Sequence, residues 1–331
     1  MNALLGIATN SGFALYRRDG QEWQCVRRSL VGRRVTSLIA REDVILAGTQ
    51  EGVVRSDDAG ATWRAASGGL TEPHVRWLAY HPDISDREFA GTEPAGIYVS
   101  HDGGGSWRAC SEVASLRDRH AWFLPYSDGA GCVRGFAFHG TRVYAAVEVG
   151  GALRSDDGGE TWRLAEGSDG TPDFDGSDPP FIYPDVHSIQ VHRSSPNLVF
   201  ASTGGGFYRS GDGGKTWTLL YDCYVRAAWL DPLDPLHIIL GPADRVGSLG
   251  RIEESRDGGD TWEAASKGLR APWPQTMVEH FVHNSGPQGE ELFAVLATGE
   301  LLVAPLATLE WRHVVAEVDG INAVTGIEAT A

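Results

Sequence analysis

Cysteine, methionine and long hydrophobic runs are all scarce in this sequence. Its 331 residues include 4 cysteines and 2 methionines. The cysteines are far apart and none belongs to a Cys-x-x-Cys pair, which favours reduced thiols: Cys25, Cys110, Cys132 and Cys223. Every apolar run has the length of a strand, well short of the ~18 residues of a membrane-spanning helix. The N-terminal segment MNALLGIATN lacks the basic start and apolar stretch of a secretion signal. These absences predict a soluble, cytoplasmic protein.

Positively charged residues are also in the minority. Lys and Arg number 28 against 44 Asp and Glu, which gives a formal net charge of −16 at pH 7. This excess repels nucleic-acid phosphates and anionic membrane surfaces. We therefore expect neither nucleic acid nor membrane as a partner, but a small anionic ligand or another protein. The oligomeric state stays open, and a monomer agrees with the sequence.

What the sequence has in abundance is an internal repeat. Five copies of the pattern Ser-x-Asp-x-Gly-x-Ser/Thr-Trp begin at Ser56, Ser100, Ser155, Ser210 and Ser255, and two worn copies end at Trp23 and Trp311. We expect each aspartate to accept backbone N–H groups across a turn and each glycine two residues later to adopt a positive φ. The boxes are therefore structural and carry no chemistry.

Three strand-like stretches precede each box, and a short one follows it. In the second copy these are RVTSLIA, VILAGT, GVVRS and, after the turn, WRAA. The tryptophans stand 40 to 55 residues apart, at positions 23, 63, 107, 162, 217, 262 and 311, a spacing typical of propeller blades. The sequence predicts an all-β fold, a seven-bladed β-propeller of four-stranded antiparallel blades, of the WD40/YVTN-like kind.

Only six first strands are available for the seven boxes. Blade one begins at its second strand, LLGIAT, whereas the C-terminal segment INAVTGIEA has the character of an unused first strand. We expect residues 1–331 to form a single domain, in which a C-terminal strand at about 320–329 completes blade one. Such closure removes open sheet edges.

The boxes resemble those of the BNR or Asp-box repeat superfamily, which includes sialidases, sortilin-type receptors, some xyloglucanases and the photosystem II assembly factor of plastids and cyanobacteria. The resemblance covers the whole chain and implies the propeller fold. It implies no particular activity, because these relatives include enzymes, receptors and assembly factors. The Arg-Ile-Pro signature of six-bladed sialidases is absent, so glycoside hydrolysis is a lesser alternative.

The register of the first strands predicts the wall of the central channel, since alternate residues of these strands face it. Aligned on a shared Val or Ile, the following positions hold Thr36, Arg76, Arg134, His187, Arg226, Glu279 and Asn322. The preceding positions hold Arg34, His74, Cys132, Asp185, Tyr224, Met277 and Gly320.

Three arginines at equivalent places in an acidic chain indicate an anion site at the channel mouth, because guanidinium groups bind carboxylate or phosphate in a bidentate manner. The expected ligand-binding residues are Arg34, His74, Arg76, Arg134, Asp185, Arg226 and Asn322. The alternative is a structural network in which the arginines pair with acidic neighbours such as Asp185 and Glu279.

Acid and base candidates accompany these residues. The turns between second and third strands open on the same end of the ring and carry Glu51, Glu93, Glu148 and Asp244. For a hydrolase or lyase acting on the bound anion, the candidate catalytic residues are His187, Tyr224, Glu279 and Glu148. The alternative is a non-enzymatic scaffold that presents its loop-rich face to a protein partner.

Two connections into first strands are long, at residues 108–132 and 163–186. They contain Trp122, Phe123, Tyr126, Phe174, Phe181 and Tyr183. Long aromatic loops are typical of lids, and we expect the pocket to be deepest beside blades three to five.

The sequence requires no cofactor, and a metal ion is the one candidate. His74, Cys132, His187 and His280 are expected around the pore, together with Met277, and such soft ligands favour copper or zinc. Asp169, Asp173, Asp175 and Asp178 suggest a calcium loop, although two prolines and an incomplete EF-hand pattern favour an acidic solvated loop.

Overall fold

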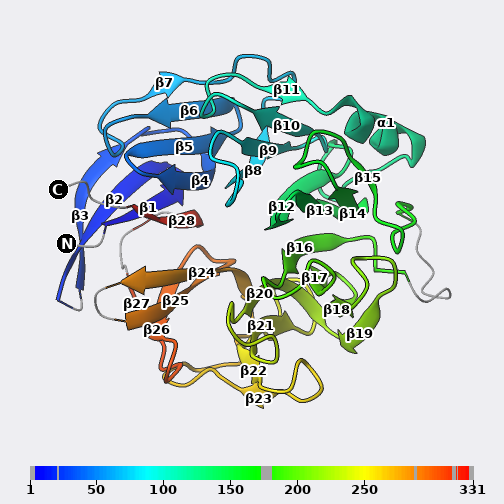
Figure 1. Ribbon diagram of the computed structural model, residues 1–331. Coiled ribbons are helices and arrows are strands. Elements are labelled where there is room, and N and C mark those ends of the chain that lie inside the picture. The colour runs from blue at the N-terminus through cyan, green and yellow to red at the C-terminus, as the bar shows by residue number, and fades with distance from the viewer. Residues whose placement is uncertain are drawn as a thin grey trace.

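Seven four-stranded antiparallel sheets stand around a central channel in the computed structural model (Figure 1), which describes residues 4–20, 22–172, 181–286, 289–314, 318 and 320–327. Blade 1 contains β28 (Ile321–Ile327), β1 (Leu4–Thr9), β2 (Gly12–Asp19) and β3 (Glu22–Ser29); blade 2 contains β4 (Val35–Arg41), β5 (Val44–Thr49), β6 (Gly52–Ser56) and β7 (Arg64–Ala65). Blade 3 contains β8 (Val75–Tyr80), β9 (Glu88–Thr92), β10 (Ile97–Ser100) and β11 (Arg108–Ala109); blade 4 contains β12 (Cys132–His139), β13 (Arg142–Glu148), β14 (Gly151–Ser155) and β15 (Arg163–Leu164). Blade 5 contains β16 (Val186–Val191), β17 (Val199–Thr203), β18 (Gly206–Ser210) and β19 (Thr218–Tyr221); blade 6 contains β20 (Tyr224–Leu230), β21 (Ile238–Ala243), β22 (Glu253–Ser255) and β23 (Glu263–Ala264); blade 7 contains β24 (Val278–Gly286), β25 (Gly289–Leu296), β26 (Leu301–Pro305) and β27 (Arg312–His313). The predicted fold class is confirmed.

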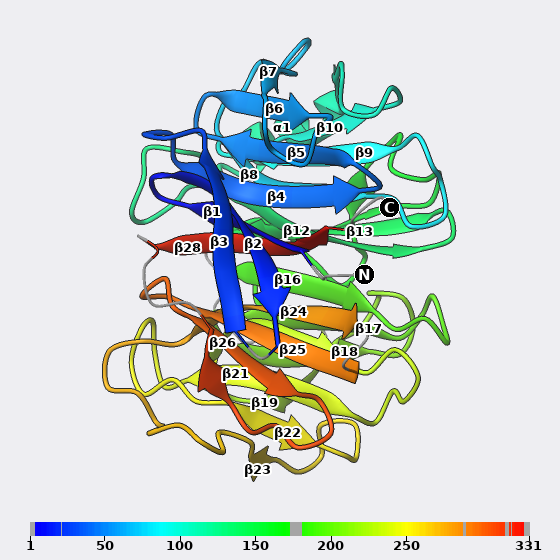
Figure 2. The ribbon, with the colours of Figure 1, turned by 90° about the vertical axis from the view of Figure 1, so that its left-hand side faces the viewer.

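The C-terminal strand closes the ring, as the sequence predicted. β28 pairs antiparallel with β1, with Leu4 opposite Ile327 and Thr9 opposite Ile321. Figure 2 shows β28 beside β1, although the two strands lie at opposite ends of the chain. Blade 1 therefore joins the first and last described strands in one sheet, and β1 has no open edge.

Apolar side chains from neighbouring blades pack together. One cluster joins blades 3 and 4. It contains Phe89, Val133 and Leu153, each 0% exposed, together with Trp162. The Val or Ile on which the first strands were aligned is buried in every blade, with exposed fractions of 0 to 5%: Val35, Val75, Val133, Val186, Val225, Val278 and Ile321. The residues that flank it are thereby fixed in position relative to the channel.

The Asp-box turns have the predicted hydrogen bonds. In blade 6 the backbone N–H and the hydroxyl of Thr261 donate to the two carboxylate oxygens of Asp257, over 2.9 and 2.5 Å. The hydroxyl of Ser255 donates to Asp257 over 2.8 Å and accepts the N–H of Gly259, whose φ is 98°. These bonds, those from Thr261 foremost, lower the pKa of Asp257 to about 2.

Replacement of this aspartate tests the structural role of the boxes. We expect Asp257→Ala to lower the melting temperature by about 3 °C at pH 7, because the turn loses its acceptor. An aspartate ordinarily titrates near pH 4. The stability that the depressed pKa of Asp257 gives to the folded protein is therefore fully present above about pH 4 and is lost as the pH falls toward 2.

Asp260→Ala in the same turn is the matched control, because Asp260 is exposed. Thermal unfolding from pH 7 to pH 2 measures both variants. Equal melting temperatures for the two at pH 7, or a difference that persists at pH 2, would contradict the structural role.

A short helix interrupts the first long connection. α1 (Ser111–Arg119) buries Val113 against the blade 3 and 4 cluster, and the sequence analysis did not anticipate it. Trp122, assigned to a lid, is 3% exposed and donates through Nε1 to the carbonyl of Gly170 over 2.8 Å. It therefore fastens the two long connections to each other. No helix in the described ranges is long and apolar enough to cross a membrane.

Each first strand carries a β-bulge at the same height. In β8, Val75 lies opposite Thr92 and Trp77 opposite Gly91, so Arg76 has no partner in the ladder. The other six first strands skip the equivalent position, and the residues there are Thr36, Arg134, His187, Arg226, Glu279 and Asn322; in β20 the following Ala227 is skipped as well. These are the residues that the sequence placed along the channel. A bulge re-aims a side chain and interrupts the alternation of faces.

Candidate functional site

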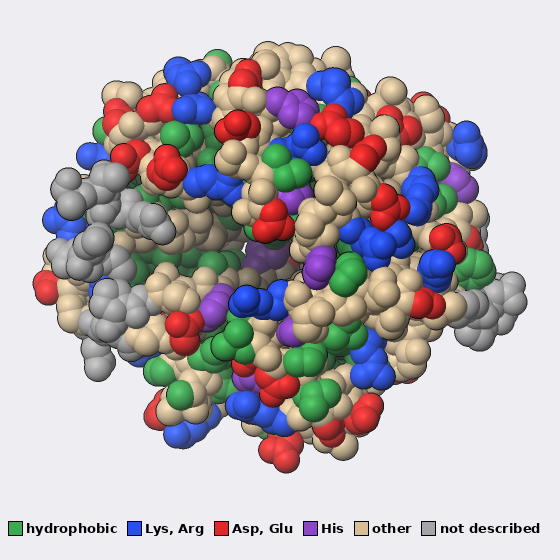
Figure 3. Space-filling view, viewed as in Figure 1, with side chains coloured by type: hydrophobic (Ala, Val, Ile, Leu, Met, Phe, Trp, Pro, Cys, Tyr) green, Lys and Arg blue, Asp and Glu red, His purple; other side chains and the backbone are tan. Residues whose placement is uncertain are grey.

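A cavity of about 610 Å³ lies at the end of the channel where the first strands begin. Its lining comes from blades 1, 2, 3, 4, 6 and 7 and consists of Arg34, Thr36, Gln50, His74, Arg76, Trp77, Glu93, Tyr126, Ser127, Arg134, Arg226, Glu279, His280, Leu296, Ala297, Ile321 and Asn322. Four arginines and two glutamates thus line one cavity in a chain of net charge −16. Seen along the channel in Figure 3, the ring is hollowed at its centre, and histidine, basic and acidic side chains border the hollow.

The position of this cavity corrects one prediction. No residue of blade 5 is among its lining residues, and blades 1, 2, 3 and 7 supply most of them. The cavity therefore lies beside blades 3 and 4 but not beside blade 5, whereas the prediction included all three. The reason is that Trp122 is packed in the core, whereas Tyr126 and Ser127 from the same connection reach the cavity beside blade 3.

Three of the bulged residues bond the neighbouring blade directly. The side chains of Thr36, His187 and Asn322 contact the carbonyl oxygens of Val75, Val225 and Val35 over 2.5, 3.0 and 2.8 Å. In each case the acceptor is the aligned residue of the next blade around the ring. These side chains therefore link adjacent first strands.

The other four bulged residues are charged and form ion pairs. Arg76 donates to Glu93 over 2.6 Å. Arg134 contacts Glu148 over 3.0 Å and, across the channel, Glu279 over 3.4 Å. Arg226 donates to the other oxygen of Glu279 over 2.5 Å. The network that the sequence offered as an alternative is thus present in part: Glu279 pairs with two arginines, Asp185 contacts His187 instead of an arginine, and Glu93 and Glu148 supply the other carboxylates.

Arg34 differs from the other three arginines of the lining. It is exposed, and within the described ranges no hydrogen bond or ion pair engages it. His74 lies 3.8 Å from Glu93, and burial lowers its pKa. The wall of blades 2 and 3 therefore presents one unpaired guanidinium to the cavity.

Two aromatic rings meet across the channel. Trp77 of blade 3 and His280 of blade 7 stack edge to face, with ring centroids 5.1 Å apart. Each directly follows a bulged residue, Arg76 or Glu279, so the bulge brings two consecutive side chains to the cavity. Burial lowers the pKa of His280 to about 4, so its ring is neutral near pH 7.

Three of the four catalytic candidates do not line the cavity. His187, Tyr224 and Glu148 lie beside it, and Glu279 alone is part of the lining. His187 is 2% exposed, and its Nε2 lies 3.3 Å from the hydroxyl of Tyr224 and 3.1 Å from Asp185. These candidate residues lie next to the cavity rather than inside it.

The protonation behaviour of these groups follows from their partners. Burial opposes ionisation of Glu279, but Arg226 and Arg134 outweigh it and hold its pKa below the usual range. Glu148 is buried likewise, and Arg134 outweighs this effect and holds its pKa low. Burial raises the pKa of Tyr224 to about 12, against the influence of Arg226. Both glutamates are therefore anions and the tyrosine is neutral near pH 7.

The predicted metal ligands do not converge. Among the described residues, the only group of three or more His, Cys, Asp or Glu that faces one point is Glu148, Asp185 and His187. His74 contacts Glu93, His280 contacts Trp77, and Cys132 donates to Glu148 over 3.2 Å. They are separated because their first strands belong to different blades. The candidate calcium loop cannot be placed, since Asp173, Asp175 and Asp178 lie outside the described residues.

Comparison with known proteins supports the fold and the repeat. A model of the BNR/Asp-box repeat matches residues 153–164, around the box of blade 4. No sequence among curated proteins matches this one significantly. Similar solved structures include an ancestral GH74 enzyme, with a TM-score of 0.63 and 18% identity over 86% of this chain.

Two similar structures were solved with peptide ligands. YCF48 bound to D1 peptide has a TM-score of 0.59 and 14% identity, over 94% of this chain and 87% of that chain. Chaetomium thermophilum Sqt1 bound to the N-terminus of the ribosomal protein L10 has a TM-score of 0.56 and 14% identity, over 96% of this chain and 84% of that chain. This chain spans only 39% of the GH74 enzyme. The chain is an Asp-box propeller, and identities this low establish no activity.

Proposed function

We propose that this propeller is a binding protein whose channel-mouth cavity takes up a carboxylate presented by a segment of a protein partner. The observation that carries the proposal is the lining charge. The lining holds four arginines and two glutamates, and Glu148 beside it pairs with Arg134, so the guanidinium of Arg34 is left as one excess positive charge in an otherwise acidic molecule. Such a site concentrates anions, and a guanidinium matches a carboxylate in a bidentate manner.

The rim of the cavity favours a protein segment over a small free anion. Apolar side chains protrude from the connections at this end of the ring: Val31 (81% exposed), Phe123 (48%), Tyr126 (56%), Val246 (61%) and Leu249 (40%). Exposed apolar and aromatic residues around a polar site are typical of protein interaction surfaces. Two propellers of similar fold hold peptides, which agrees with this proposal.

The second candidate function is catalysis, in which the protein hydrolyses a small bound carboxylate or phosphate or eliminates a group from it. Its support is the contact between His187, Tyr224 and Asp185. Against it stand the ion pairs of Glu148 with Arg134 and of Glu279 with Arg226: these carboxylates are engaged as bases and hold no proton to donate near pH 7. Binding without chemistry therefore accounts better for the groups that line the cavity.

Arg34 offers the cleanest test. We expect Arg34→Ala to weaken binding of peptides with acidic residues or free C-termini about tenfold, because one charge-assisted contact is lost. The probe is a displayed peptide library with free carboxyl ends, selected on the wild-type protein, and affinities are then measured by titration at several salt concentrations.

Arg33→Ala is the matched control, since Arg33 is exposed and does not line the cavity. Citrate and inorganic phosphate are titrated in parallel to detect a small-molecule site. Selection of basic peptides, or equal effects of the two substitutions, would refute the proposal. Tight phosphate or citrate binding with no peptide selected would favour the second candidate.

A further inference from the structure

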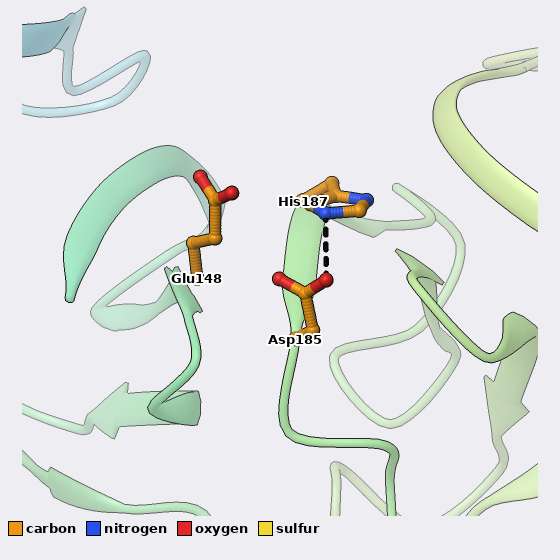
Figure 4. Close-up of side chains that lie close together, drawn as sticks. All are labelled: Glu148, Asp185 and His187. Atoms are coloured by element: carbon orange, nitrogen blue, oxygen red, sulfur yellow. Dashed lines mark ion pairs between the residues drawn. The ribbon is translucent and has the colours of Figure 1, made fainter. Parts of the chain in front are cut away.

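One cluster beside the cavity is left unexplained by this function. Glu148, at the end of β13 in blade 4, faces Asp185 and His187 at the start of blade 5 (Figure 4). One ligand atom from each of the three lies within 4.8 Å of the others. Their side chains are largely buried, with 4, 26 and 0% exposed. Two carboxylates and an imidazole are thus held together with little access to water.

The hydrogen bonds of His187 fix which nitrogen carries its proton. Nδ1 lies 3.0 Å from the carbonyl oxygen of Val225. A carbonyl only accepts, so Nδ1 is the donor and Nε2 of the neutral ring presents a lone pair. That lone pair faces a carboxylate oxygen of Asp185 at 3.1 Å. The hydroxyl of Tyr224, 3.3 Å from Nε2, can donate to this lone pair, but it does not separate Nε2 from the carboxylate oxygen. These two acceptors remain in contact unless a proton or a metal ion lies between them.

The local charge balance also lacks one positive charge. Glu148, Asp185 and Glu279 face only two guanidinium groups, those of Arg134 and Arg226. Within the described ranges, Asp185 has an ion-pair contact with no Lys or Arg, and its buried Oδ1 has no hydrogen-bond partner. The carboxylate of Asp185, which no Lys or Arg pairs with in these ranges, is thus the one next to the Nε2 lone pair of His187.

We propose that Glu148, Asp185 and His187 bind one divalent transition-metal ion, zinc or manganese, which joins blade 4 to blade 5. Imidazole and carboxylate oxygens suit both ions, whose ligands lie about 2.0–2.2 Å from the metal and therefore about 3–3.5 Å from each other. A ligating histidine characteristically donates its other N–H to a carbonyl or carboxylate, as His187 does to Val225. The site is separate from the peptide cavity, so it is tested independently of the proposed function.

The test is metal binding by the whole chain after treatment with a chelator and dialysis. With Zn²⁺ and Mn²⁺ as probes, we expect one equivalent by mass spectrometry of the metal and a melting temperature raised by about 5 °C. Asp185→Asn and, separately, Glu148→Gln are expected to lower affinity at least tenfold. Glu51→Gln is the control, because Glu51 is an exposed acid in the corresponding turn of blade 2 and its loss leaves binding unchanged.

A metal-free alternative predicts the opposite pattern. If a second proton on Nε2 bridges His187 to Asp185, neither ion raises the melting temperature of the wild type. In that case Asp185→Asn loses the ion pair and is less stable than the wild type without any metal, whereas the metal proposal expects the metal-free variant to be at least as stable as the metal-free wild type. A wild type whose melting temperature neither ion raises, or a metal-free Asp185→Asn less stable than the metal-free wild type, overturns the proposal.

Discussion

A chain ending at Val314 is expected to lose its cooperative unfolding transition and to aggregate. The truncation removes β28, whose Ile321, Val324 and Ile327 are 5, 6 and 5% exposed. Each such side chain contributes roughly 1.5–3 kcal/mol on burial, so the loss is on the order of 5 kcal/mol before the hydrogen bonds to β1 are counted. A domain stable by about 5–15 kcal/mol does not tolerate this, and β1 becomes an open edge.

The matched control is a chain ending at Ile327, which retains every residue of β28. Circular dichroism during heating and light scattering compare the two chains. A synthetic peptide of residues 318–327 added to the shorter chain is expected to restore part of the transition, since the vacant edge accepts a strand. A shorter chain with an unchanged melting temperature would show that closure does not stabilise the ring.

Removal of the central glutamate is expected to cost about 3 kcal/mol of folding free energy. Glu279 bonds both Arg134 and Arg226, and the three side chains are 16, 10 and 18% exposed. In Glu279→Ala the two guanidinium groups stay close together without the carboxylate between them, and an uncompensated buried charge is strongly destabilising. Denaturant unfolding measures the difference.

The double variant Glu279→Gln/Arg226→Gln separates charge from packing. It removes one charge of each sign and leaves Arg134 with Glu148 as its partner. We expect it to be more stable than Glu279→Gln, which keeps the same packing at position 279 and leaves both guanidinium groups without the carboxylate, and to recover more than half of the stability that this single variant loses. A double variant as unstable as Glu279→Gln would mean that charge balance does not account for the cost.

The sequence predicted the ring because its determinants are local. An Asp-box turn is closed by bonds within seven residues, for example from Thr261 to Asp257, so its pattern is visible in the sequence at every copy. The aligned Val or Ile is equally local, and it identified the seven bulged side chains without knowledge of the bulge. Closure of the ring by the C-terminal strand was predicted because the sequence shows six first strands for seven Asp boxes.

The site was predicted only in part, because ion pairing within and between blades depends on side-chain distances that no sequence pattern encodes. The acids of the turns were recognised, but Glu93 and Glu148 were not assigned to Arg76 and Arg134. Trp77 was missed because strict alternation turns it away from the channel, whereas the bulge turns it inward. His280, proposed as a metal ligand, faces that tryptophan instead.

The seven bulges have a consequence for how such a protein changes over evolutionary time. A bulged residue takes no part in the ladder, so its identity is free to vary without altering the pairing of the strands. Here the same position holds threonine, arginine, histidine, glutamate or asparagine in different blades. Mutations at these seven sites can therefore change the chemistry of the channel while the pairing of the strands is kept, provided that a lost charge such as that of Glu279 is balanced by a second change.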